Sequence, residues 1–109
     1  MSTKYKIIYS PLAVDDLRSI YLYIANTLKA KLAATNQANA IRKAIRALEI
    51  MPERFPMYES KSLHSTTFHK LPVNNYVVFY IVDKEKHIVT IVRIFYGGMD
   101  IDNALQDNL

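Results

Sequence analysis

The sequence contains no cysteine and no tryptophan, and only two of its 109 residues are glycine. Without cysteine, the chain forms no disulfide and offers no thiolate nucleophile or metal ligand. Its glycines, Gly97 and Gly98, are adjacent. A Walker loop and a dinucleotide-binding turn both need glycines that are spaced along the loop. The sequence therefore excludes nucleotide-binding functions that depend on either loop.

Long hydrophobic runs are also lacking. The longest stretch without a charged residue spans residues 71–82, which is too short to cross a bilayer as a helix. The apolar run after Lys4 and Lys6 is interrupted by Ser10-Pro11, and no small-residue cleavage site follows it. We therefore expect no signal peptide, no membrane partner and a cytoplasmic location. The chain has no HExxH or GxSxG motif, and its three histidines lack metal-ligand spacing, so we expect no metal and no cofactor.

What the sequence does contain is typical of one globular domain. Residues 1–109 are half hydrophobic, and this length can bury a single core. The net charge of +4 is unevenly distributed, because residues 1–70 carry eleven basic and five acidic side chains while the remainder is net acidic. From residue 17 to residue 48 there is no acidic residue, but six basic ones: Arg18, Lys29, Lys31, Arg42, Lys43 and Arg46. A surface of this kind attracts nucleic acid or an acidic protein segment.

Hydrophobic periodicity predicts two helices followed by three strands. Ser10 is the expected N-cap of the first helix, with Pro11 at its first position, and the helical pattern runs on to Leu28. Lys29 and Lys31 are expected at the end of that helix. The other predicted elements are a strand at 4–9, a helix at 35–50, a loop at 53–65, and strands at 66–73, 76–82 and 87–96. The strand at 76–82 carries no charge on either face, so we expect it to be central.

These elements predict an α+β fold of order β-α-α-β-β-β, with an N-terminal helical hairpin packed on one antiparallel sheet. In the last strand, alternation places Ile91, Arg93 and Phe95 on one face, with Val92 and Ile94 on the other. An arginine in such an apolar row needs a partner, and Asp16 and Asp100 are the candidates. Alternatively, Arg93 lines a phosphate-binding cleft.

A cluster of lysine, histidine, arginine and tyrosine side chains is able to cleave RNA. Tyrosine or histidine would remove the 2′-hydroxyl proton, and the cations would stabilise charge on the phosphorus centre. The residues that could form such a cluster here are Lys70, His69, Arg93 and Tyr96.

The chain resembles the RelE/ParE superfamily of toxins from type II toxin–antitoxin modules, also described as plasmid stabilisation proteins. The likeness runs through Ser10-Pro11, Asp16-Leu17 and Tyr23-Ile24, and it is sharpest over residues 70–101, KLPVNNYVVFYIVDKEKHIVTIVRIFYGGMDI. It implies the β-α-α-β-β-β toxin fold, growth inhibition and a cognate antitoxin, whose acidic segment would meet the six basic residues and the apolar seam between helices and sheet. A toxin–antitoxin hetero-oligomer is also implied.

Three departures from the ribonuclease branch of this family bear on the target. The ribosome-dependent ribonuclease branch has basic residues where this chain has Val77 and Gly98, and a tyrosine in the tail, where this chain has none. The resemblance thus favours the ParE branch, which poisons DNA gyrase. The alternative is a RelE-like, ribosome-dependent mRNA interferase with a degenerate active site, so whether the chain is an enzyme stays open. A third interpretation is a basic interaction domain without toxicity.

Overall fold

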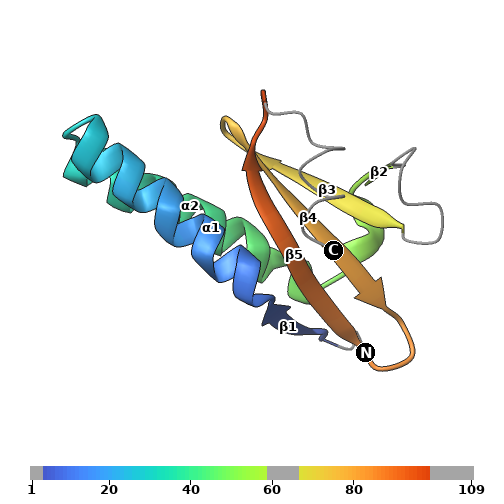
Figure 1. Ribbon diagram of the computed structural model, residues 1–109. Helices are drawn as coiled ribbons and strands as arrows, with labels where there is room; N and C mark the ends of the chain where they lie inside the picture. The colour runs from blue at the N-terminus through green and yellow to red at the C-terminus, as the bar shows by residue number, and fades with distance from the viewer. Residues whose placement is uncertain (1–3, 59–66, 99–109) are drawn as a thin grey trace.

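The computed structural model describes residues 4–58 and 67–98, and these form two helices against one sheet (Figure 1). The helical elements are α1 (Pro11–Leu22), the π-helical turn η1 (Tyr23–Thr27), α2 (Lys31–Arg46) and the 3₁₀ turns η2 (Ala47–Glu49) and η3 (Pro52–Arg54). The strands are β1 (Lys6–Tyr9), β2 (Met57–Tyr58), β3 (Phe68–Val73), β4 (Tyr76–Asp83) and β5 (Ile88–Tyr96). The predicted order of elements is confirmed, with the short strand β2 added inside the stretch that was predicted to be a loop.

The sheet has the strand order β1-β5-β4-β3-β2. Neighbouring strands from β2 to β5 are antiparallel, as predicted, and β4 is central. The prediction of a wholly antiparallel sheet was wrong at one edge, because β1 pairs with β5 in parallel. No hairpin joins these two strands, which lie at opposite ends of the chain, so no tight turn imposes an antiparallel direction on β1.

The helical hairpin turns earlier than the sequence suggested. α1 continues into the π-helical turn η1, and α2 then begins at Lys31 rather than Thr35. Lys29 reverses the chain in the left-handed conformation, with φ 54°. Lys31 was expected at the end of the first helix and instead opens the second. No glycine or asparagine stands at the left-handed position to signal the turn in the sequence.

The core of the described residues has two larger parts, one on each face of the sheet, and a small third cluster of Ile24, Ala25 and Ala34 where η1 meets α2. The part under the helices joins α1 and α2 to alternate residues of β3, β4 and β5: Ala13, Leu17, Ala38, Ile41, Ile45, Leu48, Leu71, Val73, Val78, Tyr80, Val89, Ile91 and Ile94. The part on the opposite face contains Phe68, Phe79, Val92 and Phe95. Burial on both faces explains why β4 carries no charge between Tyr76 and Val82.

Tyr80 is the largest fully buried side chain, and it ties the sheet to the turn after α2. Its hydroxyl donates a hydrogen bond of 2.6 Å to the carbonyl oxygen of Pro52. The pKa of Tyr80 is raised to about 12, mainly by burial, while the positive charge of Arg54 opposes the rise and Glu53 adds a smaller increase. This tyrosine therefore serves the fold as a neutral hydrogen-bond donor.

The Tyr80→Phe variant is expected to lose about 1–3 kcal/mol of unfolding free energy at neutral pH, because the Pro52 carbonyl then lacks its donor. A tyrosine with a raised native pKa stabilises the fold below its unfolded pKa of about 10, and this contribution is lost as the pH rises toward the native value. Urea unfolding across this alkaline range should show a steeper loss for the wild type than for the variant. If the unfolding free energy of the two proteins fell equally with rising pH, the assignment of Tyr80 as a buried, neutral hydrogen-bond donor would be contradicted.

Candidate functional site

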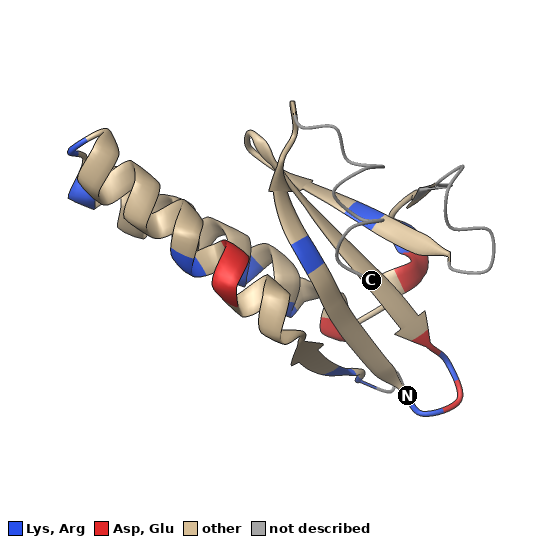
Figure 2. Cartoon of the chain, in the orientation of Figure 1, with Lys and Arg blue, Asp and Glu red and all other residues tan. Residues whose placement is uncertain are grey.

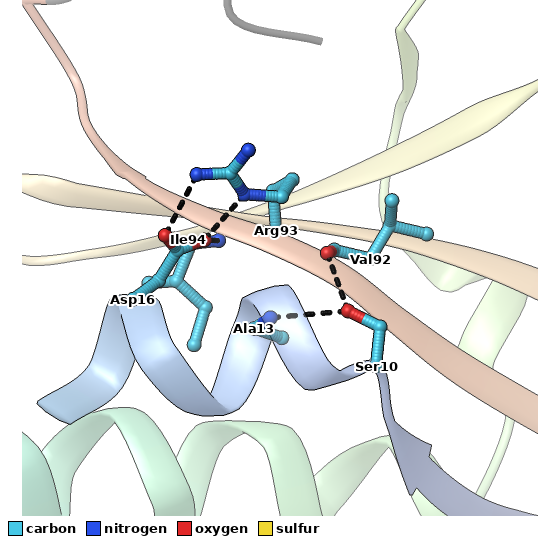
Figure 3. Close-up of polar contacts among 6 residues, drawn as sticks. All are labelled: Ser10, Ala13, Asp16, Val92, Arg93 and Ile94. Carbon is cyan, nitrogen blue, oxygen red and sulfur yellow. Dashed lines mark hydrogen bonds and ion pairs between the residues drawn. The ribbon is translucent and has the colours of Figure 1, made fainter. Parts of the chain in front are cut away.

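The start of α1 packs against the part of β5 that lies beyond its pairing with β1. That pairing ends at Ile91, so the next residues of β5 present unpaired backbone groups. The Ser10 hydroxyl donates to the Val92 carbonyl oxygen at 2.7 Å and accepts from the Ala13 amide at 3.0 Å, which makes Ser10 both N-cap and sheet contact (Figure 3). The predicted capping role of Ser10 is therefore confirmed.

A β-bulge sets the direction of the side chains in this part of β5. Phe79 lies opposite Arg93, but the next residue, Tyr80, lies opposite Ile91, so Val92 is an extra residue in β5. The predicted alternation beyond Ile91 was consequently wrong. Ile94 joins Ile91 in the core under the helices, and Val92 joins Phe95 on the other face. An inserted residue moves each later side chain of the strand to the opposite face of the sheet. The amino-acid sequence of β5 contains no signal that predicts this insertion.

Asp16 and Arg93 form a buried ion pair at this edge. The Asp16 carboxylate accepts from Arg93 Nε at 2.7 Å, from Arg93 Nη2 at 2.8 Å and from the backbone amide of Ile94 at 2.9 Å (Figure 3). The two side chains are only 14% and 12% exposed. The guanidinium also lies over the Phe95 ring, 4.5 Å from its centre. Of the two candidate partners of Arg93, Asp16 is confirmed, and Asp100 lies outside the described residues.

Both residues of this ion pair line a groove of about 740 Å³ between the helical hairpin and the ends of β4 and β5. The lining is mainly apolar and aromatic: Asp16, Ser19, Ile20, Tyr23, Ile24, Leu28, Ala33, Gln37, Asn75, Tyr76, Arg93, Ile94, Phe95 and Tyr96. Within it, Tyr76 and Tyr96 meet edge to face, with ring centres 6.0 Å apart. Burial raises the pKa of Tyr76, and the neighbouring Tyr23 and Tyr96 raise it further, so its hydroxyl is a neutral donor.

Two nitrogen atoms in this groove are buried hydrogen-bond donors for which the described residues supply no acceptor. They are Nη1 of Arg93 and Nε2 of Gln37. The carbonyl oxygen of the same Gln37 side chain is already engaged by Asn74 at 3.2 Å, which fixes the amide. Unsatisfied buried donors are costly, so each such group in a folded protein calls for a physical explanation. The groove thus has a mainly apolar lining, and two of its lining residues each contain one buried donor without a described acceptor.

Of the four residues predicted to form an RNA-cleaving cluster, Lys70 and Arg93 share one face of the sheet, each opposite Phe79, but His69 and Tyr96 do not join them. His69 is buried on the helix-covered face, where its ring stacks on Tyr80 and its Nδ1 lies 3.0 Å from the Phe55 carbonyl oxygen. Lys70, the next residue of β3, belongs to the opposite face. Tyr96 pairs with Tyr76, four residues along β4 from the partner of His69, which corresponds to about 13 Å of strand. Arg93 is held by Asp16.

The six basic residues of the predicted contact surface are all exposed, but they are spread along the hairpin (Figure 2). Arg18 lies on α1, and Lys29 and Lys31 lie where the hairpin turns. Arg42, Lys43 and Arg46 lie on the last turns of α2. Burial raises the pKa of Tyr9 on β1, and the charges of Arg42 and Arg46 oppose that rise, so their positive potential extends to the neighbouring strand.

The described residues contain no candidate metal site and no candidate membrane span. Within residues 4–58 and 67–98, no three histidine, aspartate or glutamate side chains gather as metal ligands. No helix of this described part is long and apolar enough to span a membrane. The sequence analysis anticipated a seam between helices and sheet but not the groove's residues, because the π-helical turn and the bulge that shape it leave no local signal.

Comparison with known proteins gives the following results. The model of the family described as "ParE toxin of type II toxin-antitoxin system, parDE" matches residues 7–101. No curated protein sequence matches the chain. Among solved structures, the fold is similar to a chain of the chromosomal ParDE system from P. aeruginosa, with a TM-score of 0.66 and 14% identity over 85% of this chain and 96% of that one.

Two other solved structures share the fold. The archaeal RelE–RelB complex from Pyrococcus horikoshii gives a TM-score of 0.61 and 17% identity over 88% of this chain and 98% of that one. The RelBE2 toxin–antitoxin complex from Mycobacterium tuberculosis gives a TM-score of 0.59 and 18% identity over 86% of this chain and 92% of that one. These TM-scores show that the fold is shared. At identities of 14–18%, they do not show which molecule the chain acts on.

Proposed function

Because this chain belongs to the family of ParE toxins of type II toxin–antitoxin systems, we propose that it arrests growth by poisoning DNA gyrase and that a cognate antitoxin neutralises it by occupying the groove. The toxin class follows from the family, whereas the target and the antitoxin seat are our proposal. Since gyrase works in the cytoplasm, we place the toxin there too.

The observation that carries the choice of gyrase is the separation of the RNA-cleaving candidates. A ribonuclease must bring a base, an acid and cations within hydrogen-bond reach of one phosphate. Here the His69 ring is buried against Tyr80, and the guanidinium of Arg93 is bound to Asp16. The uncharged Val77 and Gly98 add no cation where the ribonuclease branch has one. A toxin that acts by binding needs no such cluster.

The chemistry of the groove supports an antitoxin segment as its occupant. Its apolar lining suits the hydrophobic side of an amphipathic segment. Its two unsatisfied donors, Arg93 Nη1 and Gln37 Nε2, suit a carboxylate or carbonyl oxygen of that segment. Antitoxin segments that fold on binding commonly carry acidic residues, and this toxin has a net charge of +4.

Induced expression in a bacterial host tests the proposed target. We expect growth arrest, a DNA-damage response and intact bulk mRNA, because poisoned gyrase leaves cut DNA. Co-expression of the small reading frame next to this gene should restore growth, and it serves as the control. Codon-phased mRNA cuts with undamaged DNA would instead support the RelE-like alternative. Normal growth would support the interpretation as a basic interaction domain without toxicity.

A further inference from the structure

One exposed side of α2 carries three basic residues and no acidic one, and the groove does not use it. Successive helical residues turn by about 100°, so the stripe formed by Lys31, Thr35, Asn39, Arg42 and Arg46 falls within about 80° of arc. All five side chains are exposed. Ala33 and Gln37, the α2 residues that line the groove, lie on the opposite side of the helix.

The stripe has a regular layout along the helix axis. Lys31 begins α2 and Arg46 ends it, about 22 Å away at a rise of 1.5 Å per residue. Lys31 and Arg42 are separated by about 17 Å, and Thr35 and Asn39 stand between them as uncharged polar groups. The Asn39 side chain accepts from Arg42 Nη1 at 3.3 Å, which orients that guanidinium. No acidic residue occurs anywhere in α2 (Figure 2).

We propose that this face of α2 binds the phosphate backbone of duplex DNA. Cations at both ends of a straight helix, with hydrogen-bonding side chains between them, match a helix lying at a major groove, which is about 12 Å wide and bordered by two phosphate backbones. The inference deepens the proposed function, because gyrase holds duplex DNA. Its test uses the toxin without gyrase, so that the two proposals fail separately.

The composition of the face distinguishes duplex DNA from other polyanions. Proteins that bind single strands stack the bases on aromatic side chains, and α2 contains no aromatic residue. The major groove of an RNA duplex is too deep and narrow for a helix to enter. An acidic protein segment needs apolar anchors, and on this face only Leu32 is a large hydrophobic residue. The apolar anchoring surface is the groove on the other side.

Fluorescence anisotropy with the purified full chain and a short labelled DNA duplex tests the proposal. The three cations of the face predict that the logarithm of affinity falls with the logarithm of salt concentration at a slope of about −2.7. The Arg42→Gln/Arg46→Gln variant should reduce the slope by about two thirds and the affinity roughly 10- to 100-fold near 0.1 M salt. Retained secondary structure and melting temperature would show that the variant is folded.

The matched control is Lys84→Gln/Lys86→Gln, which removes the same charge from the exposed turn between β4 and β5. Lys84 forms a surface ion pair with Glu53, and removing such a pair should cost little folding stability. The proposal is supported if only the α2 variant loses affinity and slope. It is overturned if the two variants behave alike, if an RNA duplex binds equally well, or if polyglutamate displaces the DNA at equal charge concentration.

Discussion

Replacing Asp16 with alanine is expected to lower the free energy of unfolding by about 3–5 kcal/mol, a large share of the total stability of a domain of this size. The carboxylate accepts three hydrogen bonds, two from Arg93 and one from the Ile94 amide. Its removal leaves a guanidinium that is 12% exposed without its counter-charge. Urea unfolding monitored by circular dichroism measures the loss.

The control for this variant is Asp16→Asn, which keeps one oxygen as an acceptor and should lose less than the alanine variant. Replacing both partners with apolar residues, as in Asp16→Leu/Arg93→Met, should also cost less than the single alanine change, because no buried charge is left unpaired. A loss of unfolding free energy below about 1 kcal/mol for Asp16→Ala would contradict the buried ion pair. Arg93 would then be available to bind a phosphate.

Truncating two exposed groove residues, as in Tyr23→Ala/Leu28→Ala, is expected to weaken the complex with the antitoxin by about 4 kcal/mol, or roughly a thousandfold in Kd. These side chains are 53% and 56% exposed in the toxin, so their apolar surface is available to a partner. Both line the groove. Titration calorimetry or surface plasmon resonance with the antitoxin measures the change.

The matched control is Leu12→Ala/Val14→Ala, which removes comparable exposed apolar surface from α1 outside the groove. It should leave the affinity within a few fold of the wild type. Similar losses in both variants would mean that the antitoxin lies elsewhere on the hairpin. High salt should weaken the wild-type complex without abolishing it, because apolar burial is insensitive to screening.

The sequence was sufficient for the architecture because its strongest signals are local. Ser10-Pro11 indicates the start of α1 through capping chemistry, and the structure contains the capping bond from the Ala13 amide to Ser10 and Pro11 at the first helical position. The uncharged stretch at 76–82 identified the central strand, since only a strand covered on both faces tolerates so few polar groups. Hydrophobic spacing likewise identified both helices, although it misplaced the start of α2.

The features that the sequence did not disclose depend on tertiary contacts. The left-handed Lys29 and the bulge at Val92 use residue types that give no turn or bulge signal. For the candidate site, the need of Arg93 for an acidic partner was predictable from its apolar neighbours, and Asp16 was one of two expected partners. The groove and its two unsatisfied donors were not predictable, because they arise where α1, α2 and the bulged strand converge.

The most direct test of the account is a DNA cleavage assay with purified gyrase, supercoiled plasmid and the purified chain. The account predicts that the toxin converts plasmid to gyrase-linked linear DNA, and that adding the antitoxin beforehand prevents this. Absence of cleaved DNA at saturating toxin, together with cuts within codons of ribosome-bound mRNA in a parallel translation reaction, would contradict the account.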